Sequence, residues 1–563
     1  MDAANAVAPV WQARFPQAAL WTAPIEITTL PELLAAGVKA GGERTALAFR
    51  DARIGYGDLA REVECLASGL ATIGVRHGEA VALLLPNTPD HPLAFFALTR
   101  LGARVVPISA LDARREIAHK IEITGARRLI TTNLPGFLPG ALQMLEAGAV
   151  DQVLVCDDAR WGVGDAVPLT VPDIPGVLGL ARLFSDAPLK APAPQADDIA
   201  VLQFTGGTTG LPKAAMLSHG NLTAAVNMYR AWRDGGRPLV AGTETVVAVL
   251  PLFHIYALTT VLLRHLRDGN MLLLRQRFDV EALIDDIRLH RVSQFSGVPT
   301  MWVALLNRPG VDQVDFSSLK SCVSGGAPLP FEVQARIEAL IGLPLKNGWG
   351  MTETGPAGSR VPESAPRRPG LIGIPLPGLE LRVVDPNAPG QVRPPGEIGE
   401  IAICGPNVFK GYLNDPAATE AAFHEGWFLT GDMGRMDTSG LFEIADRRKN
   451  LIISSGFNVY PAVVENAIHE HPAVEEVIVI GVPDAYRGQS AKAYVKLKAD
   501  AEPFTLDALT QFLADRIGRH EMPRALEFRA ALPRSPVGKL LPKVLMAEVA
   551  AQGAESGDGA ITS

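Results

Sequence analysis

The chain has 563 residues, of which 47% are apolar and 20% charged, and its formal net charge is −8. This composition supports a sizeable hydrophobic core and excludes global disorder, and a prior of ~150 residues per domain suggests three or four structural units. The acidic balance also excludes a basic nucleic-acid-binding surface, so an anionic ligand would need positive charge supplied locally.

The four cysteines lie far apart and show no metal-binding spacing. Reduced thiols and a cytoplasmic location are therefore expected. The N-terminal residues lack the charged and apolar regions of a signal peptide, and no apolar run approaches the ~20 residues of a transmembrane segment. Peripheral membrane contact through a surface patch and a homodimer both stay open.

From about Gly78, short aliphatic segments alternate with amphipathic ones, which predicts βαβ units and mostly parallel sheets. The expected strands are residues 78–87, 103–109, 127–132, 244–250, 270–276, 292–297 and 319–326. The expected helices are residues 89–102, 115–125, 256–266, 279–291 and 300–307.

After about Gly370 the pattern changes to short strands with Gly and Pro turns, and then to a smaller α+β unit with a helix around residues 506–517. We therefore predict an α/β fold with a large N-terminal domain, residues 1–445, of layered and mostly parallel sheets with flanking helices and a small β-subdomain. A smaller, mobile α+β C-terminal domain is expected over residues 446–550. Residues 551–563 are small and polar, which predicts a disordered tail.

The segment QFTGGTTGLPKAAMLSHGN, residues 203–221, follows an expected strand and is rich in glycine and threonine. Its glycines permit close backbone approach to a ligand, its free N–H groups and threonine hydroxyls can donate to an anion, and Lys213 adds a positive charge. These features fit a polyphosphate. The loop is not a Walker A motif, because Ala214 stands where Ser or Thr would hold Mg²⁺. A flexible Gly/Thr turn without a ligand is the plainer alternative.

This loop resembles the phosphate loop of the adenylate-forming (AMP-binding) superfamily, which includes acyl-CoA synthetases, beetle luciferases and the adenylation domains of peptide synthetases. Gly206 replaces the serine of the usual text T-S-G-T-T-G-x-P-K-G, and Ala214 replaces its last glycine. The resemblance covers roughly residues 25–545 and is closest to medium- and long-chain fatty-acyl-CoA synthetases. Its further motifs are Gly325–Pro328, Gly348–Thr354, Trp427–Asp432, Asp446–Pro461 and Ser535–Lys543.

The resemblance implies that the chain binds ATP and Mg²⁺. It assigns ATP or AMP binding to Thr205, Gly206, Gly207, Thr208, Thr209, Gly210, Lys213, Gly326, Ala327, Pro328, Gly348, Trp349, Gly350, Met351, Thr352, Asp432 and Arg447. It assigns catalysis to Lys213, Thr352, Glu353 and Lys539, with Glu353 as the metal ligand. Read without the resemblance, Trp349 is an ordinary core residue, Glu353 a solvated loop carboxylate and Asp432 a turn former.

The C-terminal motifs imply a hinge at Lys449 and a mobile lysine at Lys539 that stabilises the negative charge developing on phosphate. Taken alone, the run DRRKN at residues 446–450 is typical of a solvated charged surface. Pro542 departs from the basic helix usual in the family and predicts a shortened helix.

The acyl pocket is assigned to His254, Tyr256, Val298, Gly325 and Gly350, which are small, apolar or aromatic. An apolar tunnel gains ~0.8 kcal/mol for each buried methylene, which favours a medium- or long-chain fatty acid. Arg264 and Arg267 lie on a nearby expected helix, so a dicarboxylic acid is an alternative. The acceptor thiol is expected to be CoA, held by Ser455, Gly456 and Phe457.

The leading functional prediction is therefore an ATP-dependent acid–CoA ligase that forms AMP. An aryl-acid CoA ligase and a free-standing acyl-AMP ligase that loads a carrier protein are alternatives. A luciferase-like oxygenase is a further one. A nucleotide-binding regulatory protein that keeps the fold without the reaction represents a different functional class.

Overall fold

The computed structural model describes residues 10–15, 21, 24–205, 212–232, 239–327, 329, 331–454, 457–484, 487–514, 516–519, 521–534 and 540–557. The chain divides into two compact units, each formed by separate stretches of sequence. Unit 1 comprises Met1–Pro366, Ile372–Glu380 and Ile403–Phe428, and unit 2 comprises Arg367–Leu371, Leu381–Ala402 and Leu429–Ser563. The predicted boundary at residue 446 falls inside unit 2.

Unit 1 contains a first seven-stranded sheet, named sheet A, with the strand order β14-β13-β12-β10-β11-β1-β2. Its strands run parallel except for β2, which closes an antiparallel hairpin with β1. The bounds are β1 Thr45–Phe49, β2 Ala52–Gly55, β10 Thr245–Ala248, β11 Met271–Leu274, β12 Gln294–Gly297, β13 Ser321–Ser324 and β14 Leu345–Lys346.

The second seven-stranded sheet of unit 1, sheet B, has the order β7-β6-β5-β3-β4-β8-β9. It is parallel apart from the β8–β9 hairpin. The bounds are β3 Ala80–Leu83, β4 Arg104–Pro107, β5 Arg128–Thr132, β6 Gln152–Cys156, β7 Val177–Gly179, β8 Ile199–Thr205 and β9 Lys213–Ser218.

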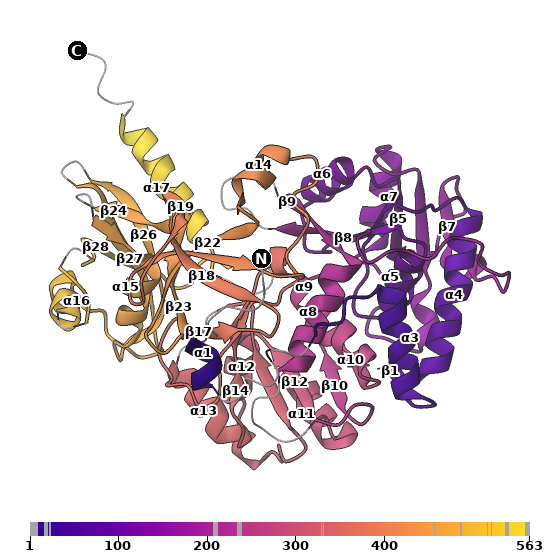
Figure 1. The fold of residues 1–563 in the computed structure, drawn as a ribbon, viewed down its shortest axis with the longest axis horizontal. Coiled ribbons are helices and arrows are strands. Elements are labelled where there is room, and N and C mark those ends of the chain that lie inside the picture. Colours follow the sequence, from indigo (N-terminus) through magenta and orange to yellow (C-terminus); the bar gives the residue numbers. More distant parts are fainter. Residues whose placement is uncertain are drawn as a thin grey trace. The chain divides into compact units, whose positions relative to one another are not determined.

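A layer of helices lies between the two sheets, as Figure 1 shows in indigo and magenta. In this layer α5 and α8 contact sheet B, the η3–α10 segment contacts sheet A, and α3 contacts α5, α8 and α10. The bounds are α3 Leu30–Gly41, α4 Tyr56–Thr72, α5 Asp90–Arg100, α8 His219–Ala231, α9 Ile255–Ala257, η3 Leu258–Leu263 and α10 Arg264–Arg267. The short N-terminal helix α1 is Val10–Arg14.

The outer faces of the two sheets are covered by further helices and hold the main cores. Leu283, Ile287, Trp302 and Ile337 of the outer helices pack on Val247 and Phe295 of sheet A. Ile117, Ile121, Leu138 and Ala141 pack on Leu129 and Val153 of sheet B. The bounds are α6 Arg114–Thr124, α7 Leu138–Glu146, α11 Val280–His290, α12 Pro299–Leu306 and α13 Phe331–Ile341.

Short elements complete unit 1. The strands β15, β16 and β17 form antiparallel pairs, and β21 pairs with the start of β22. The bounds are β15 Gly348–Trp349, β16 Ser359–Arg360, β17 Leu371–Pro375, α14 Pro416–Ala421 and β21 Phe423–His424, with the short turns η1 Asp158–Trp161, η2 Leu180–Leu183, η4 Val311–Gln313 and η5 Thr352–Thr354.

Unit 2 contains five strands in the order β23-β22-β20-β18-β19 and a second, five-stranded sheet with the order β25-β24-β27-β26, in which β28 also pairs with β27. The first set is β18 Glu380–Asp385, β19 Ala388–Val392, β20 Gly399–Cys404, β22 Trp427–Met436 and β23 Phe442–Arg447. The second set is β24 Ile452–Ser454, β25 Phe457–Val459, β26 Val474–Asp484, β27 Gly488–Leu497 and β28 Ala525–Phe528.

The residues of β26 alternate between two small cores of unit 2. Val477 and Val479 pack toward α15 and α16, whereas Ile478 and Ile480 pack toward Leu545 of α17. This alternation follows from the two-residue period of a strand. The bounds are η6 Arg448–Asn450, α15 Pro461–His469, α16 Leu506–Leu513 and α17 Pro542–Gly557.

The predicted fold class is confirmed, because the chain is α/β with mostly parallel sheets and a smaller β-containing C-terminal part. Three elements differ in detail. The expected helix 256–266 contains a π-helical segment, Leu258–Leu263, and α16 ends four residues before the expected Ile517. Pro542 begins α17 and does not interrupt it, because the first turn needs no backbone donor.

Helix α17 continues through residues 551–557, past the point where the disordered tail is predicted to begin. Among the described residues, no helix combines the length and apolar character that crossing a membrane requires.

Candidate active site

The predicted acyl and nucleotide residues of unit 1 gather at the carboxyl edge of sheet A. His254 and Tyr256 follow β10, Val298 follows β12, and Gly325–Ala327 follow β13. The motif that begins at Gly348 follows β14. Because ligands of open parallel sheets bind beyond the carboxyl ends of the strands, this clustering is the arrangement a binding site requires.

The phosphate-loop residues that the structure describes lie at the ends of the β8–β9 hairpin. Thr205 ends β8 and is paired in register with Lys213, which begins β9. The Gln203 amide donates to the Phe253 carbonyl at 3.2 Å, which joins this hairpin to the segment that carries His254. Gly206, Gly207, Thr208, Thr209 and Gly210 lie outside the described residues.

A segment far along the chain lies beside β9. Leu413 donates its backbone N–H to Ala214 O at 2.8 Å, and Met216 donates to Gly411 O at 2.9 Å. Gly411 has a φ of +115°, a backbone conformation that favours glycine. This pairing places the next residue, Tyr412, beside Lys213.

Tyr412 joins the two oppositely charged residues of the predicted site. Its hydroxyl donates to Glu353 Oε1 at 2.9 Å, and the Lys213 ammonium lies 5.4 Å from its ring centroid. Lys213 also forms an ion pair with Asp415 Oδ2 at 2.9 Å. The Ala418 backbone N–H and then Lys213 hold the pKa of Asp415 below its usual range.

Glu353 is 6% exposed and lies in the turn η5. Asn407 supports this turn, because its side-chain amide donates to the carbonyls of Thr354 and Ala357, each at 2.6 Å. A single carboxylate near β9, which begins after the predicted phosphate loop, fits Mg²⁺, because this ion takes few protein ligands and completes its shell with phosphate oxygens and water.

Trp349 packs closely against glycine. It pairs with Ser359 across β15 and β16, and a Cβ added at Gly358 would lie 2.5 Å from its ring. A Cβ at Gly350 would lie 1.4 Å from the Pro356 carbonyl oxygen. Glycine is therefore required at Gly350 and Gly358 for the backbone to come this close. Trp349 is 9% exposed, so little of its ring is free for a base to stack on.

The turn after β13 meets the segment after β10. Gly326 has a φ of +79°, and a Cβ at Gly325 would lie 2.7 Å from the Tyr256 ring. His254 accepts the Tyr256 backbone N–H at its Nδ1 atom, 3.2 Å away, and so begins α9 as a helix cap. The structure thus brings together the predicted acyl residues Tyr256 and Gly325.

In unit 2, Asp432 and Arg447 are register partners on β22 and β23. Asp432 is buried, and its backbone N–H donates to the Thr430 hydroxyl at 3.1 Å. The preceding Gly431 has a φ of +72° and donates its N–H to Glu400 Oε1 at 2.9 Å. Glu400 also pairs with Arg448, so one buried carboxylate holds both the Gly431 turn and the start of η6.

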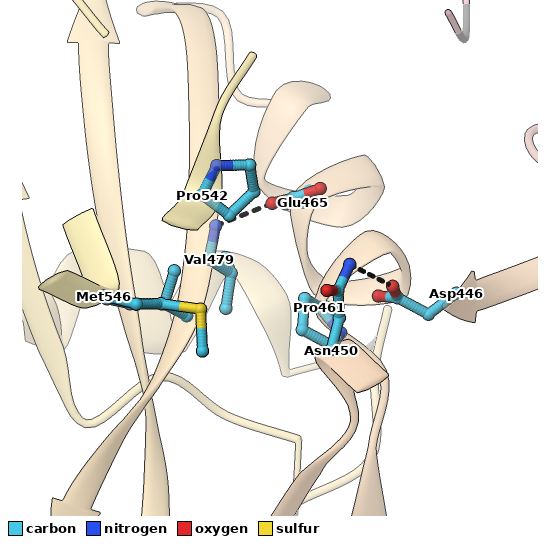
Figure 2. A pocket seen from close by; sticks show the side chains of 8 residues that line it. Asp446, Asn450, Pro461, Glu465, Val479, Pro542 and Met546 are labelled. Carbon is cyan, nitrogen blue, oxygen red and sulfur yellow. Dashed lines mark hydrogen bonds between the residues drawn. The ribbon is translucent and has the colours of Figure 1, made fainter. Parts of the chain in front are cut away.

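The segment around the predicted hinge is fixed by Asp446 (Figure 2). Its carboxylate accepts the Asn450 amide at 3.1 Å and the Ala462 backbone N–H at 2.6 Å. The second bond caps the N-terminus of α15, where a negative charge is favourable. Lys449 lies between these contacts, in the single turn η6.

The remaining predicted residues cannot be placed at a site. Lys539, Ser455, Gly456 and Pro328 lie outside the described residues, and Phe457 is described only by its backbone at the start of β25. Their assigned roles stay predictions. Met351 and Thr352 lie in or next to the η5 turn with Glu353.

Three residues described above were not predicted from the sequence as site residues: Tyr412, Asp415 and Glu400. The sequence Gly411-Tyr412 could have indicated Tyr412, because a glycine before an aromatic residue allows the close backbone approach seen here. Asp415 precedes Pro416, which is typical of a helix start. No signal in the sequence singled out Glu400.

Two known protein families match the sequence of this chain. The family described as "AMP-binding enzyme" matches residues 34–413, and the family described as "AMP-binding enzyme C-terminal domain" matches residues 463–539. The chain belongs to the AMP-binding enzyme family. It is an AMP-forming acyl-CoA synthetase, that is, an adenylate-forming CoA ligase, as the predictions of family and enzyme class stated.

This ligase is 34% identical to a long-chain-fatty-acid–CoA ligase of Bacillus subtilis over 96% of its own length and 98% of that protein. It is 36% identical to a feruloyl-CoA synthase of Amycolatopsis over 88% of its length and 94% of that protein. Its fold is similar to the ATP-bound crystal structure of MatB from Rhodopseudomonas palustris, with a TM-score of 0.81, 27% identity and coverage of 92% and 98%.

Proposed function

We propose that this ligase converts a medium- or long-chain aliphatic carboxylic acid into its CoA thioester with ATP and Mg²⁺, by way of an acyl-adenylate. The observation that carries the proposal is that Glu353 and Lys213 both contact Tyr412, at the end of the β8–β9 hairpin. It sets a buried carboxylate and a cation beside the loop whose composition fits a polyphosphate.

In the first step the substrate carboxylate oxygen forms a bond to the α-phosphorus of ATP, and the bond from that phosphorus to the β-phosphate bridge breaks to release pyrophosphate. The carboxylate is already ionised near neutral pH and needs no general base. Lys213 and the Thr205 loop orient the phosphates, and Asp432 and Arg447 bind the ribose. Glu353 would hold Mg²⁺, which would supply positive charge to the phosphate oxygens.

In the second step the CoA thiol loses its proton to water, its sulfur forms a bond to the acyl carbonyl carbon, and AMP leaves with the electrons of the broken acyl–oxygen bond. Similarity to a fatty-acid ligase along nearly the whole chain supports an aliphatic acid. Similarity to a feruloyl-CoA synthase supports an aryl acid as the second candidate.

The test is pyrophosphate release from ATP and Mg²⁺ with a panel that spans acetate, octanoate, palmitate, octanedioate, benzoate and 4-hydroxycinnamate, each with and without CoA. We expect CoA-dependent turnover that is highest for an aliphatic acid of eight or more carbons. Turnover confined to the aryl acids would contradict the aliphatic assignment. Acyl-adenylate formation without any CoA thioester would contradict the choice of acceptor.

A further inference from the structure

Arg264 is a half-buried cation of unit 1 that the proposed chemistry does not use. It begins α10, and among the described residues its buried Nε atom has no hydrogen-bond partner. The carboxylate one helical turn away, Asp268, already accepts from Arg230 Nε at 2.5 Å. Burial lowers the pKa of Arg264 from its ordinary value, and the negative charge of Asp268 opposes part of this decrease. A cation withdrawn from water costs free energy unless an anion compensates it.

Two tyrosines lie close to this cation. Tyr229 comes from α8 and Tyr256 from α9, and α8 packs against η3 and α10 (Figure 1). Burial raises the pKa of Tyr229, and the charges of Arg360 and Arg264 oppose the rise. The same two charges act on Tyr256. The Arg360 guanidinium lies 5.8 Å from the Tyr229 ring centroid. Two positive charges and two phenol donors therefore form one cluster.

This cluster adjoins the residues assigned to the acyl pocket. Tyr256 lies against Gly325, where an added Cβ would be 2.7 Å from its ring. The Tyr229 hydroxyl donates to the Pro356 carbonyl oxygen at 3.5 Å, a long bond that it would exchange for one to a bound carboxylate, and the same oxygen excludes a side chain at Gly350. Both tyrosines thus touch glycine turns of that pocket.

Arg264 lies farther along the same helical segment than Tyr256. The two are eight residues apart, about two helical turns, and the π-helical residues Leu258–Leu263 lie between them. Thr260 lies midway and donates its hydroxyl to the Tyr256 carbonyl at 2.7 Å. A ligand that extends past Tyr256 toward Arg264 would have an apolar body and an anionic far end.

We propose that Arg264, with Tyr229 and Tyr256, binds a second carboxylate at the far end of the substrate, so that the preferred acids are dicarboxylic acids of medium length. The inference rests on the proposed function and specifies its substrate class. A guanidinium binds a carboxylate through two parallel hydrogen bonds, and phenol hydroxyls satisfy its remaining lone pairs. The positive charge of Arg360 also favours a carboxylate over a neutral hydroxyl.

The experiment compares octanedioate with octanoate, which share their carbon count and differ at the far end. We measure kcat/KM for CoA-dependent pyrophosphate release with the natural chain, with Arg264→Met and with Arg264→Lys. The natural chain is expected to prefer octanedioate. Arg264→Met is expected to reduce the ratio of kcat/KM for octanedioate over octanoate by about 100-fold, because a binding group loses its charged partner. Arg264→Lys is expected to restore part of that ratio.

The matched control is Arg267→Met, the same change on the same helix at a residue whose partner is Glu26. Its octanedioate-to-octanoate ratio is expected to equal that of the natural chain. Thermal unfolding identifies any variant that fails to fold. If Arg264→Met does not fold, Tyr229→Phe replaces it, because this change removes one phenol donor. We then expect the ratio of kcat/KM for octanedioate over octanoate to decrease by about 10-fold.

Three results would overturn the inference. The first is a higher kcat/KM for octanoate than for octanedioate in the natural chain. The second is an equal decrease in kcat/KM for both acids in Arg264→Met. The third is a decrease in kcat/KM of Arg264→Met for 4-hydroxycinnamate and not for octanedioate. The proposed function fails separately, if no acid of either kind supports CoA-dependent turnover in the natural chain.

Discussion

Tyr412 keeps two opposite charges close without letting them neutralise each other. Its hydroxyl donates to Glu353, and its ring lies near the Lys213 ammonium, which pairs with Asp415 instead. A lysine bound directly to Glu353 would occupy the carboxylate that is proposed to hold the metal. The tyrosine therefore separates the proposed metal ligand from the proposed phosphate-binding cation.

Replacement of Tyr412 by Phe should weaken the binding of Mg²⁺ that pyrophosphate release requires. The buried Glu353 would lose a hydrogen bond of the charge-assisted kind, worth about 1.5–3 kcal/mol. We expect the Mg²⁺ concentration for half-maximal pyrophosphate release to rise about 10-fold. The control is Tyr56→Phe, which removes a hydroxyl that bonds the Asn270 carbonyl at 2.7 Å in the same unit. A Mg²⁺ dependence equal in all three proteins would contradict the role of Tyr412.

Replacement of Asp432 by Ala should weaken ATP binding. Asp432 is buried opposite Arg447 in the register of β22 and β23, and a carboxylate there can accept both ribose hydroxyls. We expect the dissociation constant for ATP, measured by calorimetry, to rise at least about 10-fold. The control is Asp437→Asn, at a carboxylate just beyond β22 that pairs with Arg368 and holds a turn. An unchanged ATP affinity in Asp432→Ala would exclude the ribose role.

The individual site residues were predictable to different degrees. Lys213, Glu353 and Asp432 stood in recognisable motifs, whereas Tyr412 did not. Tyr412 is 59 residues from Glu353 and 199 from Lys213 in sequence, and only the pairing of residues 410–413 with β9 brings the three together. Local sequence patterns contain no information on such a long-range pairing.

At the scale of elements, α15, β26 and α17 meet around Glu465. Its carboxylate accepts the Val479 backbone N–H at 2.7 Å and lies beside a cavity of about 50 Å³ lined also by Pro542 and Met546 (Figure 2). Burial, the larger cause, and the negative charge of Asp446 raise the pKa of Glu465 to about 8. The packing of the three elements therefore favours the protonated carboxyl group.

This raised pKa predicts a pH dependence of stability. The folded state holds the Glu465 proton more tightly than the unfolded chain, so its contribution is complete below pH 4.5 and is lost as the pH rises through about 8. We expect the unfolding free energy to fall by on the order of 2 kcal/mol from pH 5 to pH 8, a value reduced for the partial solvent contact of the group.

Glu465→Gln should remove most of this decrease, because the amide cannot ionise. Chemical denaturation at several pH values measures it. The control is Glu470→Gln, at the end of the same helix, where the carboxylate is exposed and pairs with Arg516. A pH profile of Glu465→Gln that parallels the natural chain would contradict the prediction.

Elements were predictable where their hydrophobic period was regular. Seven strands of sheets A and B lie within the expected ranges, because buried aliphatic runs between amphipathic helices have few other interpretations: β3, β4, β5, β10, β11, β12 and β13. The π-helical segment Leu258–Leu263 was not predicted, since all six residues are apolar or threonine and show no change of period. The early end of α16 was missed because Ala514 has high helix propensity.

At the scale of the whole molecule, the proposed site residues belong to both compact units. Lys213, Tyr256 and Glu353 belong to unit 1, and Asp432 and Lys539 belong to unit 2. The domain boundary at residue 446 was inferred from a change of pattern, which does not show that earlier segments such as Leu381–Ala402 join the same unit.

Lys539→Ala should separate the two half-reactions. Its positive charge is proposed to stabilise the transition state of adenylation, and thioester formation does not need that charge. We expect acid-dependent pyrophosphate release to fall at least about 100-fold, while a supplied acyl-adenylate still gives the CoA thioester. Lys543→Ala, the other lysine of that motif, is the control. Loss of both half-reactions in a folded Lys539→Ala protein would contradict this division of labour.

The interleaved sequence of the two units has a consequence for synthesis on the ribosome. Residues Leu381–Ala402 emerge before Ile403–Phe428, yet they belong to the unit whose main part, Leu429–Ser563, is made last. The strands β19, β18 and β20 can pair early, but β20 must wait for its other neighbour, β22, until residues Trp427–Met436 are translated. For the same reason no single cut in the gene yields two fragments that each contain one whole unit, so a split version of this enzyme would need several junctions.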